Sequence, residues 1–401
     1  MRKVLLLSSA LILNGCYTGT QEFPPPEKPT KWESTEKSDD IIHHVSEPTV
    51  LKNWWMRFDD ETLNTLVDMA MQNSPDRLVA EARIEQARGV RRTSLSALFP
   101  QLSTSVSGGR QDTGFEGVNS VDNLYDGGFD ASYEIDIFGK NRSTLSAAEA
   151  ELYAAEQSYQ DTTLTLIADI TRSYIDYRNA QKQGAIVEKN LGIQERTLRI
   201  AEDLFRLGEG PKLDVDRAEN LVSTTKAAIP DFQRQAENAK LRLSILIGLI
   251  PEKLNHVFNT PGDIPGADVK PVLMTPAHVL AQRPDVKAAF ATLKANTERA
   301  EAATAEFFPT LTLAGFYGIS DGAFVRNATI WNVVAGAAVA LLDFGRIEGQ
   351  IDAARAREKE AYELSRKTIL NAVVDVEMAL NDYSHIRKQR DALSQAYESS
   401  Q

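Results

Sequence analysis

Two hydrophobic periods alternate along this chain, and the order in which they occur is repeated. A helical pattern, with apolar residues every three to four positions, ends at Phe99-Pro100 and again at Phe308-Pro309. Two short runs of alternating apolar and polar residues follow each ending, and the second run closes on Phe138-Gly139 or on Phe344-Gly345. The Phe-Pro landmarks lie 209 residues apart (309 − 100) and the Phe-Gly landmarks 206 apart (345 − 139). The sequence therefore predicts two copies of helix, strand, loop, strand and long helix.

The strand pattern is clearest over residues 129–137. Phe129, Ala131, Tyr133, Ile135 and Ile137 share one face, and Asp130, Ser132, Glu134 and Asp136 share the other. This alternation predicts a half-exposed strand, and about nine to eleven residues are what a tilted strand needs to cross a bilayer. Its partner run is 102–109, and the second copy supplies 310–320 and 332–342. The intervening residues, 110–126 and 321–330, are predicted to be polar loops.

Two hairpins supply four strands, which leave open edges that lipid does not tolerate. Either several chains share one barrel, or the strands are not in a membrane. A trimer would give twelve strands, a count that comes from arithmetic and from the preference of oligomers for symmetry.

The helical run after Gly139 is very long. Residues 140–207 contain no proline, and a helix of that length spans on the order of 100 Å. Apolar residues recur every seven positions, which is typical of coiled-coil packing: Leu145, Leu152, Tyr159 and Leu166, then Leu191, Leu198 and Phe205. The run ends in a turn signal at Leu207, Gly208, Glu209, Gly210 and Pro211. A returning helix is predicted over 212–248, with a kink at Pro230.

The flanking segments differ from this pattern. Trp54-Trp55 precede an amphipathic helix that carries Leu63, Leu66, Val67 and Ala70. Such tryptophans are found at membrane interfaces, but we favour a role in anchoring this helix to its neighbours. Ser74-Pro75 predicts the start of the next helix, and the proline-rich residues 251–276 are expected to be irregular.

The first residues have the features of a signal peptide. Arg2 and Lys3 precede an apolar run that is too short to span a membrane. Gly15-Cys16 at its end resembles a bacterial lipobox, and Cys16 is the only cysteine in the chain. We expect Cys16 to carry acyl chains and to anchor the protein to the outer-membrane lipid; the alternative is an ordinary signal peptide. Residues 17–50 are rich in proline and charge and are predicted to be an extended tether, in which His43-His44 are solvated rather than a metal site.

Composition narrows the function further. The net charge of −12 disfavours binding of nucleic acid, and we expect neither a metal nor a cofactor. Glu134 and Asp136 lie two residues apart on one strand face and could be taken for an acid–base pair, but lining a wet pore is the simpler account of both. Residues 208–212 superficially match a phosphate loop, but that loop follows a strand, and here a helix precedes it. An enzyme is therefore not expected.

The doubled pattern resembles the TolC-like outer-membrane factors of tripartite efflux systems, in particular their lipoprotein branch. The residues that carry the resemblance are Gly15-Cys16, Trp54-Trp55, 73–76, Phe99-Pro100, 136–139, Ile229-Pro230, 235–239, 246–248, 283–286, Phe308-Pro309 and 342–345. The resemblance implies mixed α and β structure: a homotrimer that shares one twelve-stranded transmembrane barrel, continued by a long α-helical tunnel into the periplasm. It also implies passive export of drugs or other small molecules delivered by an inner-membrane pump and a periplasmic adaptor.

On this interpretation the chain divides into nine segments. They are a signal peptide (1–15), a lipid-anchored tether (16–50), equatorial and tunnel helices (51–98), a barrel hairpin (99–139), a helical hairpin (140–250), a linker (251–282), a tunnel helix (283–307), a second barrel hairpin (308–345) and an incomplete tunnel helix (346–401). Asp130, Glu134 and Asp136 would line the pore, and the turn at Leu207, Gly208, Glu209, Gly210 and Pro211 would contact the adaptor.

The second copy is shorter than the first. Gln401 aligns with Glu195 (401 − 206), so residues 196–250 have no counterpart. We expect a chain that ends there to be a fragment or the product of a broken gene, and not to form a closed, working duct. The alternative function is a lipid-anchored coiled-coil stalk without conduction, which would have no use for strands of bilayer length.

Overall fold

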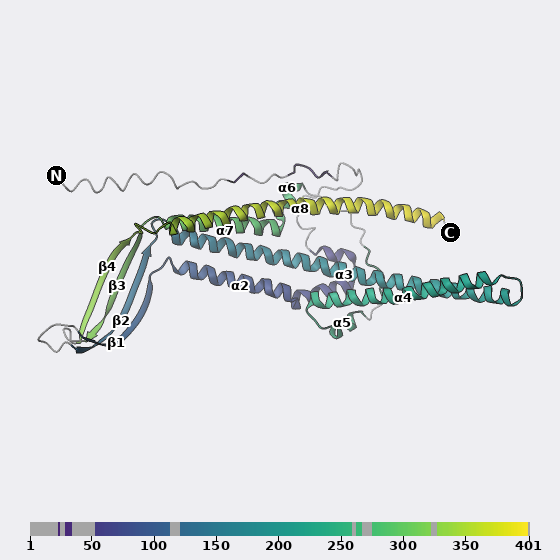
Figure 1. Cartoon of the computed structure of the whole chain (residues 1–401), viewed down its shortest axis with the longest axis horizontal. Coiled ribbons are helices and arrows are strands. Elements are labelled where there is room, and N and C mark those ends of the chain that lie inside the picture. The colour runs from purple at the N-terminus through teal and green to yellow at the C-terminus, as the bar shows by residue number, and fades with distance from the viewer. Residues whose placement is uncertain are drawn as a thin grey trace.

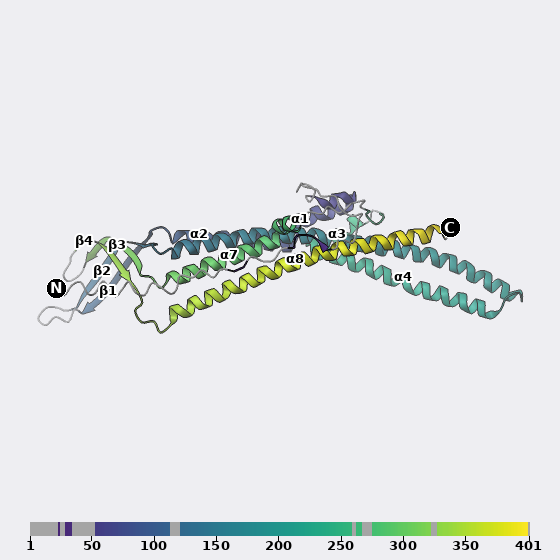
Figure 2. The ribbon, with the colours of Figure 1, turned by 90° about the horizontal axis from the view of Figure 1, so that it is seen from above.

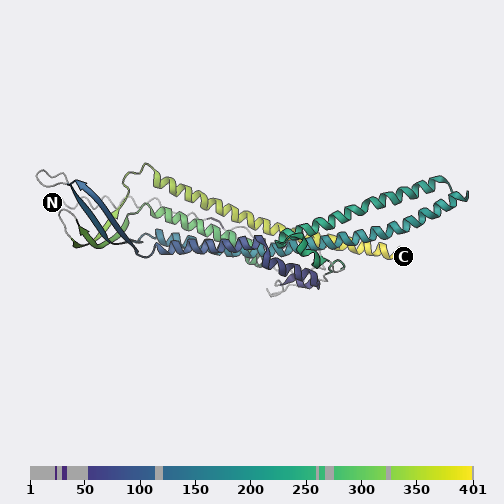
Figure 3. The same cartoon turned by 90° about the horizontal axis from the view of Figure 1, so that it is seen from below.

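The computed structural model describes residues 23–24, 29–33, 53–112, 121–258, 262–266, 275–321 and 327–399. The molecule is elongated, with its helices running lengthwise and a sheet at one end (Figure 1). A long helical hairpin projects beyond the other helices at the end opposite the sheet (Figures 2 and 3). This arrangement separates a strand-built end from a helix-built end.

The first copy of the repeat contains most of the helices. Its elements are the 3-10 helix η3 (Trp54–Phe58), α1 (Glu61–Asn73), α2 (Pro75–Ser96), β1 (Gln101–Asp112), β2 (Val121–Ile135), α3 (Lys140–Arg206), α4 (Lys212–Ile247) and α5 (Pro251–Phe258). The second copy contains α6 (Pro276–Gln282), α7 (Pro284–Ala305), β3 (Thr310–Asp321), β4 (Ala328–Ala338) and α8 (Arg346–Ser399). The predicted order of helix, strand, strand and long helix is confirmed in both copies.

The four strands form one antiparallel sheet in the order β1-β2-β3-β4. Its register reproduces the repeat. Leu102 pairs with Ala131 in the first hairpin, and adding 209 and 206 to these numbers gives Leu311 and Ala337, which pair in the second. The two hairpins are therefore the same unit twice, joined edge to edge by β2 and β3.

The helical hairpin is built from α3 and α4. The 67 residues of α3 are continuous from Lys140 to Arg206, and the 36-residue α4 returns beside it. Pro230 lies inside α4. Leu166 is buried, and the other predicted seam residues are half-buried except Phe205, which is exposed at the end of the hairpin.

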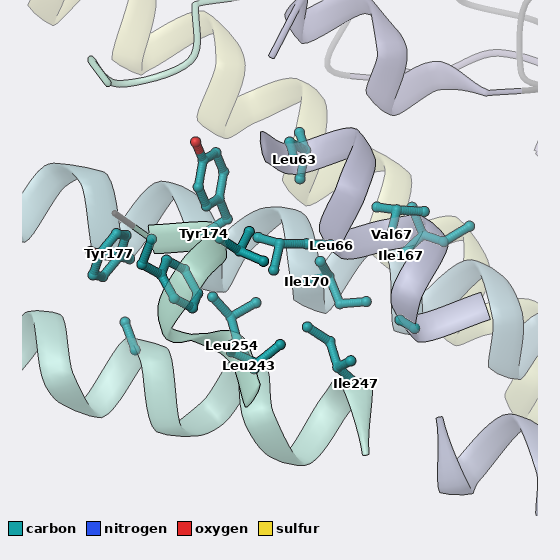
Figure 4. Close-up of a cluster of buried hydrophobic side chains, with 14 of the residues drawn as sticks. Leu63, Leu66, Val67, Ile167, Ile170, Tyr174, Tyr177, Leu243, Ile247 and Leu254 are labelled. Atoms are coloured by element: carbon teal, nitrogen blue, oxygen red, sulfur yellow. The ribbon is translucent and has the colours of Figure 1, made fainter. Parts of the chain in front are cut away.

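The main hydrophobic core lies where α1, α3, α4 and α5 meet (Figure 4). Its largest fully buried side chains are Leu63, Leu66, Val67, Ile170, Tyr174, Leu243, Ile247 and Leu254. The predicted apolar face of α1 consists of the four residues that the core buries. Trp54 and Trp55 pack against this core, as the sequence predicted.

Several predicted boundaries were wrong. Residues 251–276 are not wholly irregular, because Leu254, Val257 and Phe258 bury one face of α5 in the core. The first hairpin has longer strands than expected, because β1 runs to Asp112 and β2 begins at Val121. At the other ends, β2 stops at Ile135 and β4 at Ala338, before the predicted limits of Ile137 and Leu342.

Candidate channel surfaces

The sheet has one apolar and one polar face. Cross-strand partners lie on the same face, so the register assigns each side chain. The apolar face carries Leu102, Val106, Phe129, Tyr133, Ile135, Leu313, Tyr317, Ile319, Trp331 and Val333. Several of these are more than half exposed in the single chain, among them Trp331 at 72%. An exposed apolar surface of this extent marks a site of contact with lipid or protein.

The opposite face is mainly polar and small. It carries Ser103, Ser105, Ser107, Asp130, Ser132, Glu134, Thr310, Thr312 and Asn332. The Ser105 hydroxyl donates a hydrogen bond of 2.7 Å to the Asp130 carboxylate. Two of the three acids that the sequence singled out, Asp130 and Glu134, therefore lie on this face.

Two paired glycines make room for an aromatic ring on the polar face. Gly128 and Gly318 are directly opposite each other. A Cβ atom at Gly128 would lie 2.6 Å from the Phe316 ring, and one at Gly318 would collide with the carbonyl oxygen of Gly127. Glycine is required here by close packing, since neither position has an unusual φ.

Asp136 does not belong to the polar face, and its predicted place there was wrong. It follows the last residue of β2, where the chain turns toward α3. Its carboxylate accepts hydrogen bonds from the backbone N–H groups of Asn141 (3.2 Å) and Arg142 (2.9 Å). It thereby satisfies free donors at the start of α3, and Gly139 supplies the left-handed turn with φ 83°.

Between β4 and α8, an aspartate has the same role one position later in the repeat. Asp343 accepts hydrogen bonds from the backbone N–H groups of Ile347 (2.9 Å) and Gly345 (3.1 Å). These bonds hold the pKa of Asp343 below its usual value. The sequence offered a signal for this role, since each aspartate lies two or three residues before a glycine that precedes a helix.

The turn between α3 and α4 lies at the far end of the hairpin from the sheet. The N–H of Gly208 donates to the carbonyl of Phe205 (3.0 Å), and that of Glu209 to Leu204 (2.9 Å). This pair of bonds is a Schellman cap, with Gly208 in the left-handed conformation at φ 79°. Of the five predicted tip residues, Gly210 is half-buried and Leu207, Gly208, Glu209 and Pro211 are exposed. Leu207, at 71% exposure, gives the tip an apolar surface.

The predicted lipid attachment site, Cys16, lies outside the described residues, as do His43-His44. The nearest described segments pack along α8. Phe23 stacks on Tyr362 with ring centroids 4.5 Å apart, and the Tyr362 hydroxyl donates to the carbonyl of Pro24 (2.9 Å). Trp32 is buried against Leu380. This part of the chain therefore follows α8 away from the sheet.

The two copies also meet in a charged cluster that sequence reasoning missed. The Arg283 guanidinium contacts Asp285 (2.8 Å) at the start of α7 and Asp375 (3.0 Å) on α8. Burial raises the pKa of Asp161 on α3, and the charge of Asp285 raises it further, while Arg283 lowers it. The motif Arg-Pro-Asp gave two members of the cluster, but the others come from distant helices.

Two further observations concern membrane helices and metals. None of the helices in the described residues is both long and apolar enough to cross a membrane. Within the same residues, no group of three or more His, Cys, Asp or Glu side chains is arranged to hold a metal ion.

Comparisons with known proteins agree with this architecture. The profile of the family described as "Outer membrane efflux protein" matches residues 66–249 and 275–401. The pyoverdine export outer membrane protein OpmQ of Pseudomonas aeruginosa is 28% identical, over 100% of this chain and 85% of its own length. The probable outer membrane lipoprotein SilC of Salmonella typhimurium is 26% identical, again over 100% of this chain and 85% of its own.

A solved structure extends the likeness to three dimensions. The outer-membrane channel OprN superimposes with a TM-score of 0.84 at 30% identity, covering 96% of this chain and 87% of that one. Long helices joined to a four-stranded antiparallel sheet are thus the fold of an outer-membrane channel, and the resemblance seen in the sequence is confirmed. The chain belongs to the outer membrane efflux protein family, and it is an outer-membrane efflux channel protein.

Proposed function

We propose that three copies of this chain share one closed barrel, with the apolar sheet face toward lipid and the polar face toward a water-filled lumen. The observation that carries the proposal is the two-faced sheet, whose outer strands β1 and β4 each have one unpaired edge among the described strands. In lipid every backbone polar group needs a partner. Copies that pair β4 with β1 of the next chain supply those partners.

Strand number favours three copies over two. Two copies would give eight strands, and a barrel of that size is filled by its own side chains or holds one small ligand. Three copies give twelve strands and a wider interior. The serines and glycines of the polar face leave this interior open, while Asp130 and Glu134 give it a negative charge that favours cations.

The helical end would meet the rest of the export system. A periplasmic adaptor contacts the tip at residues 207–211, where Leu207 and Glu209 offer one apolar and one charged side chain. An inner-membrane pump supplies the energy, so passage through the channel is passive. Drugs or other small molecules are the transported class, and one relative is named for the export of pyoverdine.

The position of the N-terminal segment supports a lipid anchor at Cys16. Tyr362 lies 16 residues along α8 from Arg346, which is about 24 Å of helix toward the sheet. Cys16 lies seven residues before Phe23, and seven extended residues reach up to about 25 Å. An acylated Cys16 can therefore reach the level where α8 meets the strands, close to the membrane surface.

Heat-resistant trimers with ion conductance test the proposal. The protein is extracted from outer membranes in detergent, run unheated on a denaturing gel and reconstituted into planar bilayers. The expected result is a trimer band that heating dissociates, together with discrete conductance steps. A chain that becomes water-soluble, monomeric and non-conducting once its lipid is removed would contradict the shared barrel and support a stalk.

A further inference from the structure

We call the end of β2, where it lies beside β3, the inner junction of the sheet, and the end of β4, at the edge of the sheet, the outer junction. The strand ends earlier at the outer junction than at the inner one. β2 remains paired as far as Ile135, which lies opposite Leu311. The residue equivalent to Ile135 in the second copy is Leu341 (135 + 206), yet β4 ends at Ala338. The residues beyond it are strongly exposed, with Leu341 at 92% and Phe344 at 91%. This apolar stretch has strand sequence but no strand beside it among the described residues.

An aromatic contact shows what the inner junction has in addition. Phe138, which follows β2, stacks on Phe308, which precedes β3, with centroids 4.6 Å apart and planes at 11°. Shifted by the repeat, this pair becomes Phe344 (138 + 206) and Phe99 (308 − 209). Phe99 is 59% exposed, and the two lie at opposite ends of the strand order. Only another copy of the chain can bring such a pair together.

We propose that Phe344 stacks on Phe99 of the next copy, and that the strands between them pair in the register that the repeat dictates. This inference rests on the shared barrel proposed above. Applying the offsets to the observed pair Ile135–Leu311 gives Leu341 opposite Leu102 of the next copy. The same shift gives Ala338 opposite Ser105 and Gly336 opposite Ser107. Pairing extends β4 by three residues, to Leu341.

The small residues of the two edges fit this register. Where β2 pairs with β3, Gly128 lies opposite Gly318, and glycine is needed at both positions because the Phe316 ring lies over them. The equivalent outer pair is Val334 (128 + 206) opposite Gly109 (318 − 209), and the equivalent of Phe316 is Ser107 (316 − 209). With a serine in place of the ring, the valine has room. Where β4 would pair with β1, the larger side chain of Val334 is thus compensated by the smaller side chain of Ser107.

The backbone of the outer junction also differs from that of the inner one. Phe344 has a φ of 54°, a left-handed conformation that is strained for a residue with a bulky side chain. Phe138 does not share it. We expect residues 339–344 to relax toward the inner conformation when the next copy pairs with them.

Disulfide trapping between copies tests the register. Ser107→Cys with Gly336→Cys places two cysteines directly opposite each other, within the Cα separation that a disulfide requires. Ser107→Cys with Ala338→Cys or with Val334→Cys are matched controls, shifted by two residues on the same face. In membranes treated with an oxidant, the first pair should yield a ladder up to a covalent trimer, and the controls and single variants should not.

The stack is tested by a double-mutant cycle on trimer stability. Phe99→Ala and Phe344→Ala should each lower the temperature to which a sample must be heated before its trimer band is lost from the gel. In the double variant this temperature should be no lower than in the less stable of the two single variants. Phe344→Trp should retain most of the stability. Additive losses in the cycle would overturn the stack.

The outcomes separate this inference from the proposed function. Trimers that link through a shifted control pair, or that do not link at Ser107 and Gly336, overturn the register and leave the shared barrel standing. An unsubstituted chain that forms no trimers overturns both.

Discussion

Gly318 is the residue at which the sheet is least able to accept a side chain. The obstacle to a Cβ atom there is the carbonyl oxygen of Gly127 in the neighbouring strand, and backbone cannot move without breaking the ladder. Overpacking of this kind costs about 1–3 kcal/mol or more.

We therefore expect Gly318→Ala to reduce the amount of folded protein in the outer membrane severalfold. Gly315→Ala is the matched control, because a Cβ atom at Gly315 meets its nearest neighbour at an ordinary 3.6 Å. The measurement is the intensity of the heat-resistant band relative to total protein. Equal bands for the two variants would show that the sheet is not packed as described.

The proposed negative charge of the lumen can be tested at two side chains. Replacing Asp130 with Asn and Glu134 with Gln removes both acids from the polar face, so the preference of the conducting channel for cations should fall several-fold. Reversal potentials in a salt gradient give this preference. Glu209→Gln at the distant tip is the control for a change of charge alone, and unchanged selectivity in the double variant would contradict the lumen assignment.

Asp136 shows how far sequence reasoning reached at this scale. Alternation placed it with Asp130 and Glu134, but alternation carries no information on where a strand ends. The end is set by the cap of α3, in which the Asp136 carboxylate binds two backbone N–H groups. Asp136 fits both the strand pattern and a helix-capping role, and in the structure it caps the helix.

Among the helices, α3 packs against elements of both repeats. It carries a carboxyl group, that of Asp161, whose ionisation depends on residues of the second repeat. Burial raises the pKa of Asp161 above its usual 3.8. The folded state therefore binds this proton more tightly than the unfolded state does. Its contribution to stability is largest at low pH and is lost as the pH rises through the raised pKa.

Asp161→Asn should accordingly raise the thermal unfolding midpoint at about pH 7, and the gain should shrink as the pH falls toward about 4. Glu195→Gln, at an exposed position on the same helix, should change little at either pH. Circular dichroism at 222 nm on heating gives both midpoints. A loss of stability in Asp161→Asn at neutral pH would contradict a desolvated carboxylate.

Elements differed in how well the sequence predicted them. The length of α3 could be predicted because apolar residues recur every seven positions without an intervening proline, which is typical of one long helix packed lengthwise. The first half of β2 was missed, since Asp126, Gly127 and Gly128 do not alternate and resemble a loop. They are strand because β1 and β3 flank them on both sides, a tertiary cause that no local pattern reveals.

At the scale of the whole molecule, the repeat accounts for most of the architecture. The offsets read from the sequence reappear in the register of the sheet, and they lead to a proposed seam between copies. The charged cluster around Arg283 could not be anticipated in this way, because it joins α3, α7 and α8 through packing angles that the sequence does not encode locally.

If the sheet separates lipid from water, two adjacent valines on β4 face different surroundings. Val333 lies on the apolar face and Val334 on the polar face, at 67% and 55% exposure in the single chain. Each is replaced by cysteine and given a spin label in outer-membrane protein, after checking that the unsubstituted chain takes up no label at Cys16.

Collision rates with lipid-dissolved oxygen and with a water-soluble nickel chelate are then compared. We expect oxygen to relax the label at position 333 more strongly, and the chelate to relax the label at position 334 more strongly. Two labels that both meet the chelate and neither of which meets oxygen would contradict a membrane-spanning channel.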